Sequence, residues 1–454
     1  MRTTLSDTPA IPSAALLAGI LALLLLGLAG VFLPPLLTGA LLLALLALAL
    51  VSARPHWALA FLLLGRSSVD GFKDVLQLFP DAWYGFNLAG LFNILGLVLA
   101  LFFLARRLAR GDRLLPSAPL KWYALLLVVT LVSVPGSAAL GASVKLWTRL
   151  AGSLGIALLA LETARDEARV KLALQITFLA ALPPLVVGLY ESLTGAGRYF
   201  PGYESTSFVF RPDGTFDHPA TLGSFLVLVI ALGLAALVLN RPILHRPLLI
   251  LITLAGFTLL VLTYARAEWI GGLAAIGVIG ALRYRRLLPA AGIVVLALLL
   301  FSPGVRERLF GWNADLTLVW REDVWQASRD ILRRPTLFGS GLDTSSLLLH
   351  EEIASVSAPP HNDFLRMAIE TGVIGATVFC LTMLALSLAG WRAYRRAGRS
   401  DDALIGLTLL AVTAGGAIIS LGDNYLSYAS VQWYIWALVG LAAYQPAADR
   451  AVGE

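Results

Sequence analysis

The sequence predicts an all-α polytopic membrane protein with roughly 12–14 transmembrane helices. We expect residues 1–454 to form a single integral membrane domain. Of the 454 residues, 58% are apolar and only 14% are charged, whereas soluble domains are typically about 25% charged. The mean hydropathy is +0.81. Most of the chain is therefore predicted to lie in spans, with little length left for soluble domains.

Apolar segments recur along the whole chain, and a span needs about 20 apolar residues. The segments lie at about 14–33, 36–51, 57–65, 85–105, 120–135, 142–161, 172–192, 219–239, 247–264, 268–282, 287–302, 365–390, 404–421 and 430–444. The segment at 57–65 is short, and the first three segments need not all cross. The range of expected spans allows for this.

Loops rich in Lys and Arg alternate along the chain with loops poor in them. This pattern predicts the orientation, because cytoplasmic loops are enriched in Lys and Arg. One set of loops carries most of them: Arg54; Arg106, Arg107, Arg110, Arg113 and Lys121; Arg165, Arg169 and Lys171; Arg241 and Arg246; Arg283, Arg285 and Arg286; Arg392, Arg395, Arg396 and Arg399. Both termini are therefore predicted to be cytoplasmic. The loops around 66–84, 193–218, 303–364 and 422–429 are predicted to face outward.

The long outer loop at 303–364 is predicted to contain an amphipathic helix at about 315–334. Asp315 can cap a helix start, and Pro335 cannot continue a helix. Between them apolar residues recur at helical spacing: Leu316, Trp320, Val324, Ala327 and Ile331. We expect this helix at the membrane surface, with Trp312, Trp320 and Trp325 at the depth of the lipid headgroups.

Three motifs combine polar and aromatic residues on the predicted outer face. The first is Arg211-Pro212-Asp213-Gly214-Thr215-Phe216-Asp217-His218-Pro219, just before a span. The second is Thr263-Tyr264-Ala265-Arg266-Ala267-Glu268-Trp269, at the junction of two spans. The third is His361-Asn362-Asp363-Phe364-Leu365, which continues through Glu370-Thr371-Gly372 to Gly375.

In this order, the three motifs resemble those of the O-antigen ligase and polymerase superfamily. The resemblance rests on Arg-x-x-Gly-Thr-Phe-x-His-Pro, on an Arg with a Trp three residues later, and on His-Asn-Asp-x-Leu followed by Glu-Thr-Gly-x-x-Gly. It covers about residues 200–380, and the N-terminal half is similar only in being polytopic.

The resemblance implies a fold related to the multi-span membrane glycosyltransferases and a glycan donor carried on undecaprenyl pyrophosphate. In the ligase branch the acceptor is lipid A–core. The resemblance further implies a multi-pass protein of the bacterial inner membrane, with an active site facing the periplasm and an inverting, metal-independent reaction. We expect no cofactor, no metal and no nucleic-acid partner.

The residue chemistry agrees with such a substrate. Guanidinium groups stay charged and bind phosphate oxygens bidentately, so Arg211, Arg266 and Arg321 are candidates to hold the diphosphate. Imidazole exchanges protons near neutral pH, so His361 is the candidate base that accepts the proton of the acceptor hydroxyl. Paired carboxylates with metal-ligand spacing do not occur in the outer-face motifs.

Three of the candidates have structural alternatives. His361, which follows Pro360, could simply begin or cap a helix. Arg266 could be an interfacial arginine paired with Glu268. A loop charge at Arg211 could be neutralised by a nearby carboxylate.

Other polar residues of the outer face are weaker candidates. Arg321 could face the headgroups, and His218 is expected to have a local structural role. Lys145 and Arg149 lie in the outer half of a predicted span, where charge is costly unless it faces a cavity. They are reserve candidates for phosphate binding.

Two further pairs have simple structural interpretations. Arg366 and Glu370 lie four residues apart on one predicted helix and are expected to satisfy each other. Asp423 and Asn424 are expected to form a turn, with contact to a sugar as the alternative.

Three functions remain open beside the ligase. A polymerase or a protein O-oligosaccharyltransferase of the same superfamily would use the same leaving group with another acceptor. A transporter of an anion or a lipid is the third, and it is disfavoured because transporters carry paired polar or broken spans at mid-membrane. The single long outer loop favours the ligase over the polymerase.

Overall fold

The computed structural model describes residues 51, 53–70, 77–79, 86–197, 199–201, 208–310, 316–333, 337–353, 356, 358–396 and 400–444. The chain divides into two units, Met1–Ala53 and Arg54–Glu454, and nearly all of the described residues belong to the second unit. The apolar segments predicted at 14–33 and 36–51 lie outside the described residues, apart from residue 51.

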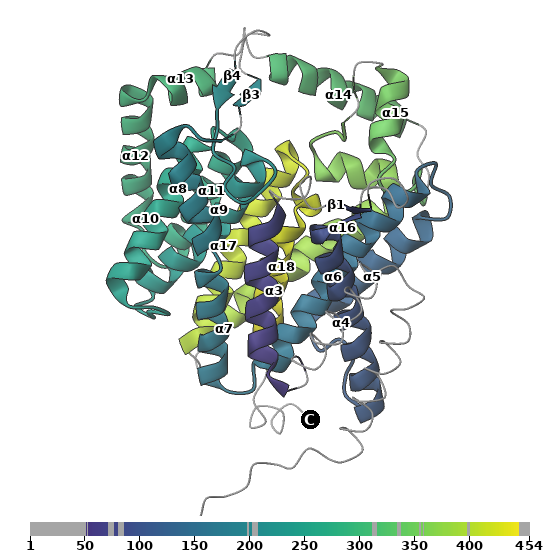
Figure 1. The fold of residues 1–454 in the computed structure, drawn as a ribbon, viewed down its shortest axis with the longest axis horizontal. Helices are drawn as coiled ribbons and strands as arrows, with labels where there is room; N and C mark the ends of the chain where they lie inside the picture. The colour runs from purple at the N-terminus through teal and green to yellow at the C-terminus, as the bar shows by residue number, and fades with distance from the viewer. Residues whose placement is uncertain are drawn as a thin grey trace, which may run out of the picture. The chain divides into compact units, whose positions relative to one another are not determined.

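The described chain is mainly helical (Figure 1). Its helices are α3 (Pro55–Val69), α4 (Leu88–Arg110), α5 (Ala118–Ser133), α6 (Leu140–Thr163), α7 (Glu167–Leu179), α8 (Leu182–Thr194), α9 (Pro219–Val238), α10 (Arg246–Leu262), α11 (Arg266–Leu282), α12 (Leu287–Phe301), α13 (Pro303–Phe310), α14 (Leu316–Leu332), α15 (Ser345–Glu352), α16 (Asp363–Arg395), α17 (Ser400–Gly422), the 3₁₀ helix η3 (Tyr425–Ser427) and α18 (Ala429–Ala442).

Two small antiparallel strand pairs accompany the helices. β1 (Gln77–Phe79) pairs with β2 (Phe86–Asn87), and β3 (Tyr199–Pro201) pairs with β4 (Phe208–Phe210). Each pair joins two helices, α3 with α4 and α8 with α9. The pairs satisfy backbone groups in the connections without forming a larger sheet.

Six stretches of the described chain are helical, long and apolar enough to cross a membrane. They are Leu88–Arg110, Leu140–Thr163, Glu167–Thr194, Pro219–Val238, Asp363–Arg395 and Asp401–Gly422. α5, α10 and α18 are shorter apolar helices, and α12 bends by 97° into α13. The prediction of an all-α polytopic membrane protein is therefore confirmed. The predicted total of spans includes segments outside the described residues.

One predicted span contains a break between two helices. The segment at 172–192 folds as α7 and α8, which meet near Ala181. Pro183 and Pro184 lie in the first turn of α8, and proline lacks the N–H that would continue a preceding helix. The proline pair therefore explains why the chain begins a new helix here.

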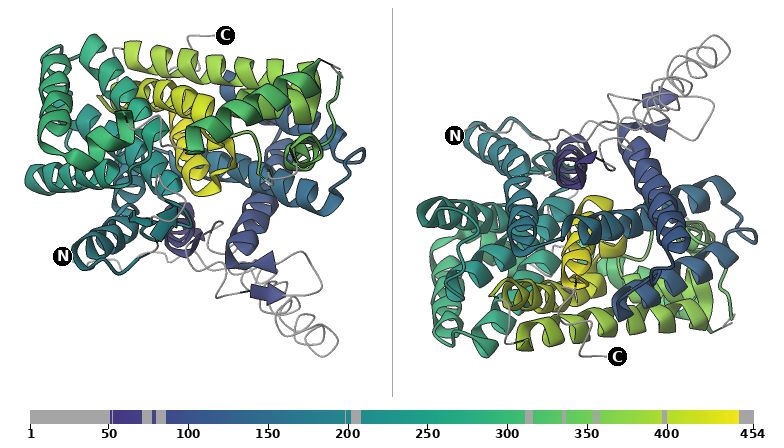
Figure 2. Two further views of the ribbon diagram at one scale, coloured as in Figure 1. Left: turned by 90° about the horizontal axis from the view of Figure 1, so that it is seen from above. Right: turned by 90° about the horizontal axis from the view of Figure 1, so that it is seen from below.

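The core of the described bundle is built around α9 and α18. Trp433, Tyr434 and Trp436 of α18 are among its largest fully buried side chains. Tyr123 of α5 stacks on Trp436 with ring centroids 3.8 Å apart. Seen from above and below, the last helices lie among the others rather than at the edge (Figure 2). The apolar sequence of α18 on every side is explained by this central position.

Glycines bring α4 and α6 into close backbone contact. A side chain added at Gly155 would collide with the carbonyl oxygen of Gly96, and one added at Gly152 would meet the carbonyl of Asn93 at 2.9 Å. Small residues allow membrane helices to approach closely and gain packing contacts. This contact fixes the position of α6, which lines the cavity described below.

Three shorter helices lie at the end of the bundle that the sequence predicts to face outward. Figure 1 shows α14 crosswise to the long helices, with α15 beside it and α13 farther away at the same end. The apolar stripe of α14 packs against α15: Val324 and Ala327 form a buried cluster with Leu349 and Val356. The stripe predicted to face the membrane surface is therefore covered by protein. Trp312 lies outside the described residues.

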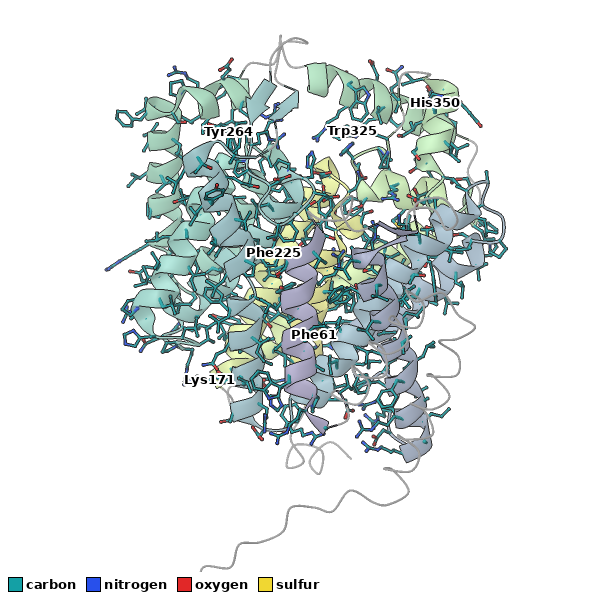
Figure 3. All side chains as sticks on the ribbon, in the orientation of Figure 1. Phe61, Lys171, Phe225, Tyr264, Trp325 and His350 are labelled. Atoms are coloured by element: carbon teal, nitrogen blue, oxygen red, sulfur yellow. The ribbon has the colours of Figure 1, made fainter. Side chains whose placement is uncertain are left out.

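The two ends of the bundle separate the two predicted sets of loops. Figure 3 places Lys171 at one end and Tyr264 and Trp325 at the other. Lys171 belongs to the basic loops predicted to be cytoplasmic, and Tyr264 and Trp325 to the outer set. The alternation of charge along the sequence therefore agrees with the ends of the folded bundle.

The contact between α4 and α6 can be tested with matched glycine substitutions. We expect Gly155→Ala to lower the melting temperature in detergent, because overpacking costs about 1–3 kcal/mol. Gly277→Ala in α11 is the control, since a side chain there meets nothing within 4 Å; it should leave the melting temperature unchanged or raise it slightly. Equal effects of the two variants would contradict the close packing.

Candidate functional site

A polar cavity of about 790 Å³ opens among the ends of several helices. Its lining comes from the C-terminal end of α3, the first turns of α4 and α6, the start of α9, the loop before α16, and the chain from η3 to α18. Its charged and polar members are Arg66, Asp70, Asn93, Lys145, Arg149, Asp217, His218, Thr221, Asp343, His361, Arg366, Asn424, Ser427 and Tyr428. Cationic, acidic and imidazole groups therefore share one space.

His361 lies on this cavity and is held by an aspartate that the sequence analysis assigned to a turn. Its Nδ1 lies 2.9 Å from Oδ1 of Asp423, and the Asp423 side chain is 6% exposed while that of His361 is 29% exposed. A carboxylate can only accept, so Nδ1 carries the proton. In the neutral ring Nε2 is then the basic nitrogen.

The electrostatics of this pair favour an ionised aspartate. Burial alone would raise the pKa of Asp423. The hydrogen bond from His361 and the charges of His361 and Arg321 outweigh burial and hold the pKa well below its usual range. A permanent carboxylate at Nδ1 stabilises the imidazolium that forms when Nε2 accepts a proton.

The next two residues of the motif, Asn362 and Asp363, are hydrogen-bonded to the end of α17 and the loop that contains Asp423. The Asn362 side chain donates to the carbonyl of Leu421 over 3.1 Å and accepts from the backbone of Phe364 and Leu365, which caps α16. Oδ2 of Asp363 accepts from the Ser420 hydroxyl and from the Leu426 N–H. Consecutive residues of the motif therefore fasten the start of α16 to the end of α17.

Two tryptophans of α14 complete the surroundings of His361. Trp320 meets the imidazole edge-to-face, with ring centroids 5.6 Å apart, and Nε1 of Trp325 donates to the carbonyl of Pro360 over 2.9 Å. His361 itself has φ +47°, a conformation that is uncommon for residues with a side chain. The strained backbone and both tryptophans fix the direction of the ring.

The Glu-Thr-Gly part of the motif breaks α16. Gly372 has φ +67° inside the helix, so the carbonyls before it are available to other partners. The N–H of Ser340 donates to Ile369, and the N–H of Gly341 donates to Glu370, each over 3.0 Å. The break attaches the end of the long loop to α16.

Arg211 precedes α9 in the chain, and its side chain reaches the turn between α10 and α11. Its Nε donates to the carbonyl of Thr263 over 2.7 Å, and its charge acts on His218 and Glu268. The rest of the first motif has a structural role: Glu191 of α8 accepts from the N–H groups of Asp213 and Gly214.

Arg266 begins α11 and contacts α13. It donates to the carbonyl of Arg308 over 3.4 Å, and Arg308 donates in turn to the carbonyl of Tyr264. Nε1 of Trp269 donates to the carbonyl of Leu260. The motif therefore shapes the turn before α11, and Arg266 is not among the residues that line the cavity.

Arg321 is directed toward the His361 pair. Its charge acts on Asp423 and on the buried Glu268, and its guanidinium lies near Gly422. Among the sequence-predicted arginines, Arg321 therefore acts on both Asp423 and Glu268, and Arg211 acts on Glu268. Arg266 lies two residues before Glu268, at the start of α11.

His218 lines the cavity but has a capping role. Its Nδ1 accepts from the N–H of Ala220 over 3.1 Å at the start of α9, as the expected local role requires. Shielding from bulk water by the cavity walls, together with the charge of Arg211, lowers its pKa to about 4. His218 is therefore neutral at physiological pH.

Four cations line the cavity: Arg66, Lys145, Arg149 and Arg366. Lys145 and Arg149, the reserve candidates of the sequence analysis, both line it. Arg366, predicted to pair with Glu370, does so over 2.9 Å and also binds Asp343 and Ser427.

Arg66 was missed because 57–65 was taken as the whole apolar segment, which placed it in a loop. In the structure α3 continues to Val69 and buries Arg66 in an ion pair with Asp70. Asp423 was missed as a partner of His361 because the two lie 62 residues apart. An isolated carboxylate in a short outer loop of an apolar chain was the available signal.

One comparison with known proteins supports a family resemblance for part of the chain. A family model described as O-antigen ligase matches residues 248–380. Over these residues the chain is similar to the O-antigen ligase and polymerase superfamily. The match includes Arg266, Arg321 and His361, begins after Arg211 and ends before Asp423. No curated protein matches the chain.

Members of this superfamily are glycosyltransferase-like membrane enzymes that act on lipid-linked glycans and lipid A–core-type substrates in general. The described helices agree with a multi-pass membrane member. Within the described part of the chain, no group of three or more His, Cys, Asp and Glu side chains is placed to hold a metal ion.

The capping role of His218 gives a pH prediction. The folded pKa of about 4 lies below the ordinary value of 6.5, so the unfolded chain binds more protons between these two values. The contribution of His218 to stability is therefore lost as the pH falls from about 6.5 to 4. In His218→Asn, where Asn can still cap α9, we expect a smaller fall in melting temperature over this range. Identical pH profiles would contradict the assignment.

Proposed function

We propose that this protein is an O-antigen ligase of the bacterial inner membrane. It transfers a glycan from undecaprenyl pyrophosphate to lipid A–core on the periplasmic face. The reaction is inverting and needs no metal. The observation that carries the proposal is the His361–Asp423 pair on a polar cavity, in a chain similar to this superfamily.

In the proposed step, the acceptor hydroxyl oxygen attacks the anomeric carbon of the donor sugar. The bond between that carbon and the diphosphate oxygen breaks, and the diphosphate leaves with the electron pair. The hydroxyl proton passes to Nε2 of His361. Asp423, hydrogen-bonded to Nδ1, stabilises the positive charge that the ring gains. Attack opposite the leaving group inverts the anomeric configuration.

The leaving diphosphate is bound by Arg211, Arg266 and Arg321 in this proposal. Guanidinium groups stabilise the negative charge that develops on the leaving oxygen. Support comes from Arg211 and Arg321, whose charges act on the residues around His361. Arg266 begins α11, close along the chain to Thr263, to which Arg211 is bonded. Its contact with Arg308 orients it from α13.

The alternatives keep the leaving group and change the acceptor. A polymerase would use a sugar hydroxyl of another repeat unit, and a protein O-oligosaccharyltransferase would use a Ser or Thr hydroxyl. A transporter is less favoured, since its polar groups should lie at mid-membrane. Here they collect around the ends of α3, α6, α16 and α17. The lipopolysaccharide gel pattern of a deletion strain separates ligase from polymerase: loss of all capping indicates the ligase.

The role of His361 can be tested with purified protein, a polyprenyl-pyrophosphate glycan and lipid A–core. We expect His361→Ala to lower kcat by about 10²–10⁴-fold, the usual contribution of a general base. His350→Ala is the matched control, because His350 lies exposed in the same loop and binds the Val356 carbonyl. It should retain parental activity.

Asp423→Asn serves as a second variant for the same test. It should lower kcat by a smaller factor than the loss of the base, because the ring remains but loses the fixed negative charge at Nδ1. A His361→Ala protein that transfers glycan as fast as the parent would rule out the mechanism.

Metal removal provides a separate test. We expect transfer rates to stay the same in excess EDTA and after addition of Mg²⁺ or Mn²⁺, because arginines rather than a metal neutralise the diphosphate. The measurement is the initial rate with donor and acceptor at fixed concentrations. Loss of transfer in EDTA, restored by one of these ions, would overturn the metal-independent reaction.

A further inference from the structure

Two cations on α6 line the His361 cavity together. Lys145 and Arg149 lie four residues apart on α6, and this spacing puts them on one face of the helix. Arg149 donates to the backbone carbonyl of Ser427 over 3.2 Å, which directs its guanidinium toward the cavity floor near η3. Lys145 is exposed, one turn nearer the outer end of α6.

The charges of the cavity are distributed unevenly over its walls. Among the described lining residues, cations come from Arg66, Lys145, Arg149 and Arg366, and carboxylates from Asp70, Asp217 and Asp343. Asp70 is bound by Arg66, and Asp343 is bound by Arg366. Arg366 also binds Glu370. The wall formed by α6 contributes two cations and no carboxylate to this lining, so an anionic ligand at that wall would meet positive charge.

Arg149 and two of the arginines assigned to the donor act on different carboxylates. The charge of Arg149 interacts with Arg66, Asp70, Asp343 and Arg366. By contrast, the charges of Arg211 and Arg321 act on Glu268. The first group belongs to α3, α6 and α16, and the second to the chain before α9 and to α14. His361 lines the cavity on one side and binds Asp423 on the other, so it lies between the two groups.

We infer that Lys145 and Arg149 form a second anion subsite, which binds a phosphate group of the acceptor glycolipid. The inference rests on the proposed transfer reaction and extends it to the recognition of the acceptor. Lys145 supplies an ammonium group, and Arg149 a guanidinium that donates to the carbonyl of Ser427.

The two-subsite arrangement meets a requirement of the reaction. Transfer needs the anomeric carbon of the donor and the hydroxyl of the acceptor near Nε2 of His361 at the same time. Two anionic lipids repel each other, so separate cationic groups are needed to hold them at short distance. A cavity of about 790 Å³ has room for sugar units of the acceptor beside the imidazole.

The test uses lipid A–core before and after phosphatase treatment, with a fixed polyprenyl-pyrophosphate glycan as donor. We expect Lys145→Gln and Arg149→Gln to raise the KM for the phosphorylated acceptor by about tenfold, the effect of losing one charge-assisted hydrogen bond. The KM for the donor should stay the same. On the dephosphorylated acceptor, the parent and the variants should show equal KM values.

Lys171→Gln is the charge-matched control, because Lys171 is exposed at the opposite end of the bundle (Figure 3). It should leave both KM values unchanged. Lys145→Arg should restore the acceptor KM. Lys145 is exposed, so its substitution tests the subsite even if loss of Arg149 impairs folding. Direct binding of the two acceptor forms to detergent-solubilised protein repeats the test without turnover.

The possible failures are distinct. If the parent transfers no glycan, or if His361→Ala is fully active, the proposed function fails. If the parent is active but Lys145→Gln raises the KM for the donor, the subsite belongs to the donor and the inference fails. It also fails if the parent uses phosphorylated and dephosphorylated acceptors equally well.

Discussion

The hydrogen bonds between residues 361–363 and the loop that follows α17 determine the position of the proposed base. His361 binds Asp423, Asn362 binds Leu421, and Asp363 binds Ser420 and Leu426. Each of these polar groups would be costly to leave unpaired in a largely apolar protein. Because three consecutive residues share the same partner loop, the imidazole is oriented by a segment whose own backbone is fixed. The ring cannot turn away without breaking its bond to the aspartate.

The same attachment connects several packed helices of the described bundle to the cavity. α16 packs on α5 and α17, and α17 packs on α9 and α11. The end of α17 therefore brings α11 toward His361, together with the turn before α11 that Arg211 contacts. α6, held against α4 by Gly96 and Gly155, supplies the opposite wall. The strain at His361, with φ +47°, is maintained by these surrounding contacts.

Sequence periodicity predicted the helices well, but it did not predict which loops lie against one another. Apolar runs identified the spans, and Pro and Asp marked the ends of α14, because these signals are local. His361 could be found because imidazole at a span entrance is chemically distinctive. Asp423 could not be paired with it, since periodicity describes the faces of one helix and not which loops meet. For the same reason the tryptophans of α14 were assigned to lipid headgroups, whereas Trp320 and Trp325 contact the His361 segment.

Arg321 connects the two parts of the proposed chemistry. Its charge acts on Asp423 and helps to keep that carboxylate ionised, while its guanidinium is a proposed ligand of the donor diphosphate. When an anion binds Arg321, part of the positive charge near Asp423 is offset. The imidazolium that forms at His361 is then stabilised more strongly by its aspartate. Arg321 would thus link the binding of the donor to the pair that receives the proton of the acceptor hydroxyl.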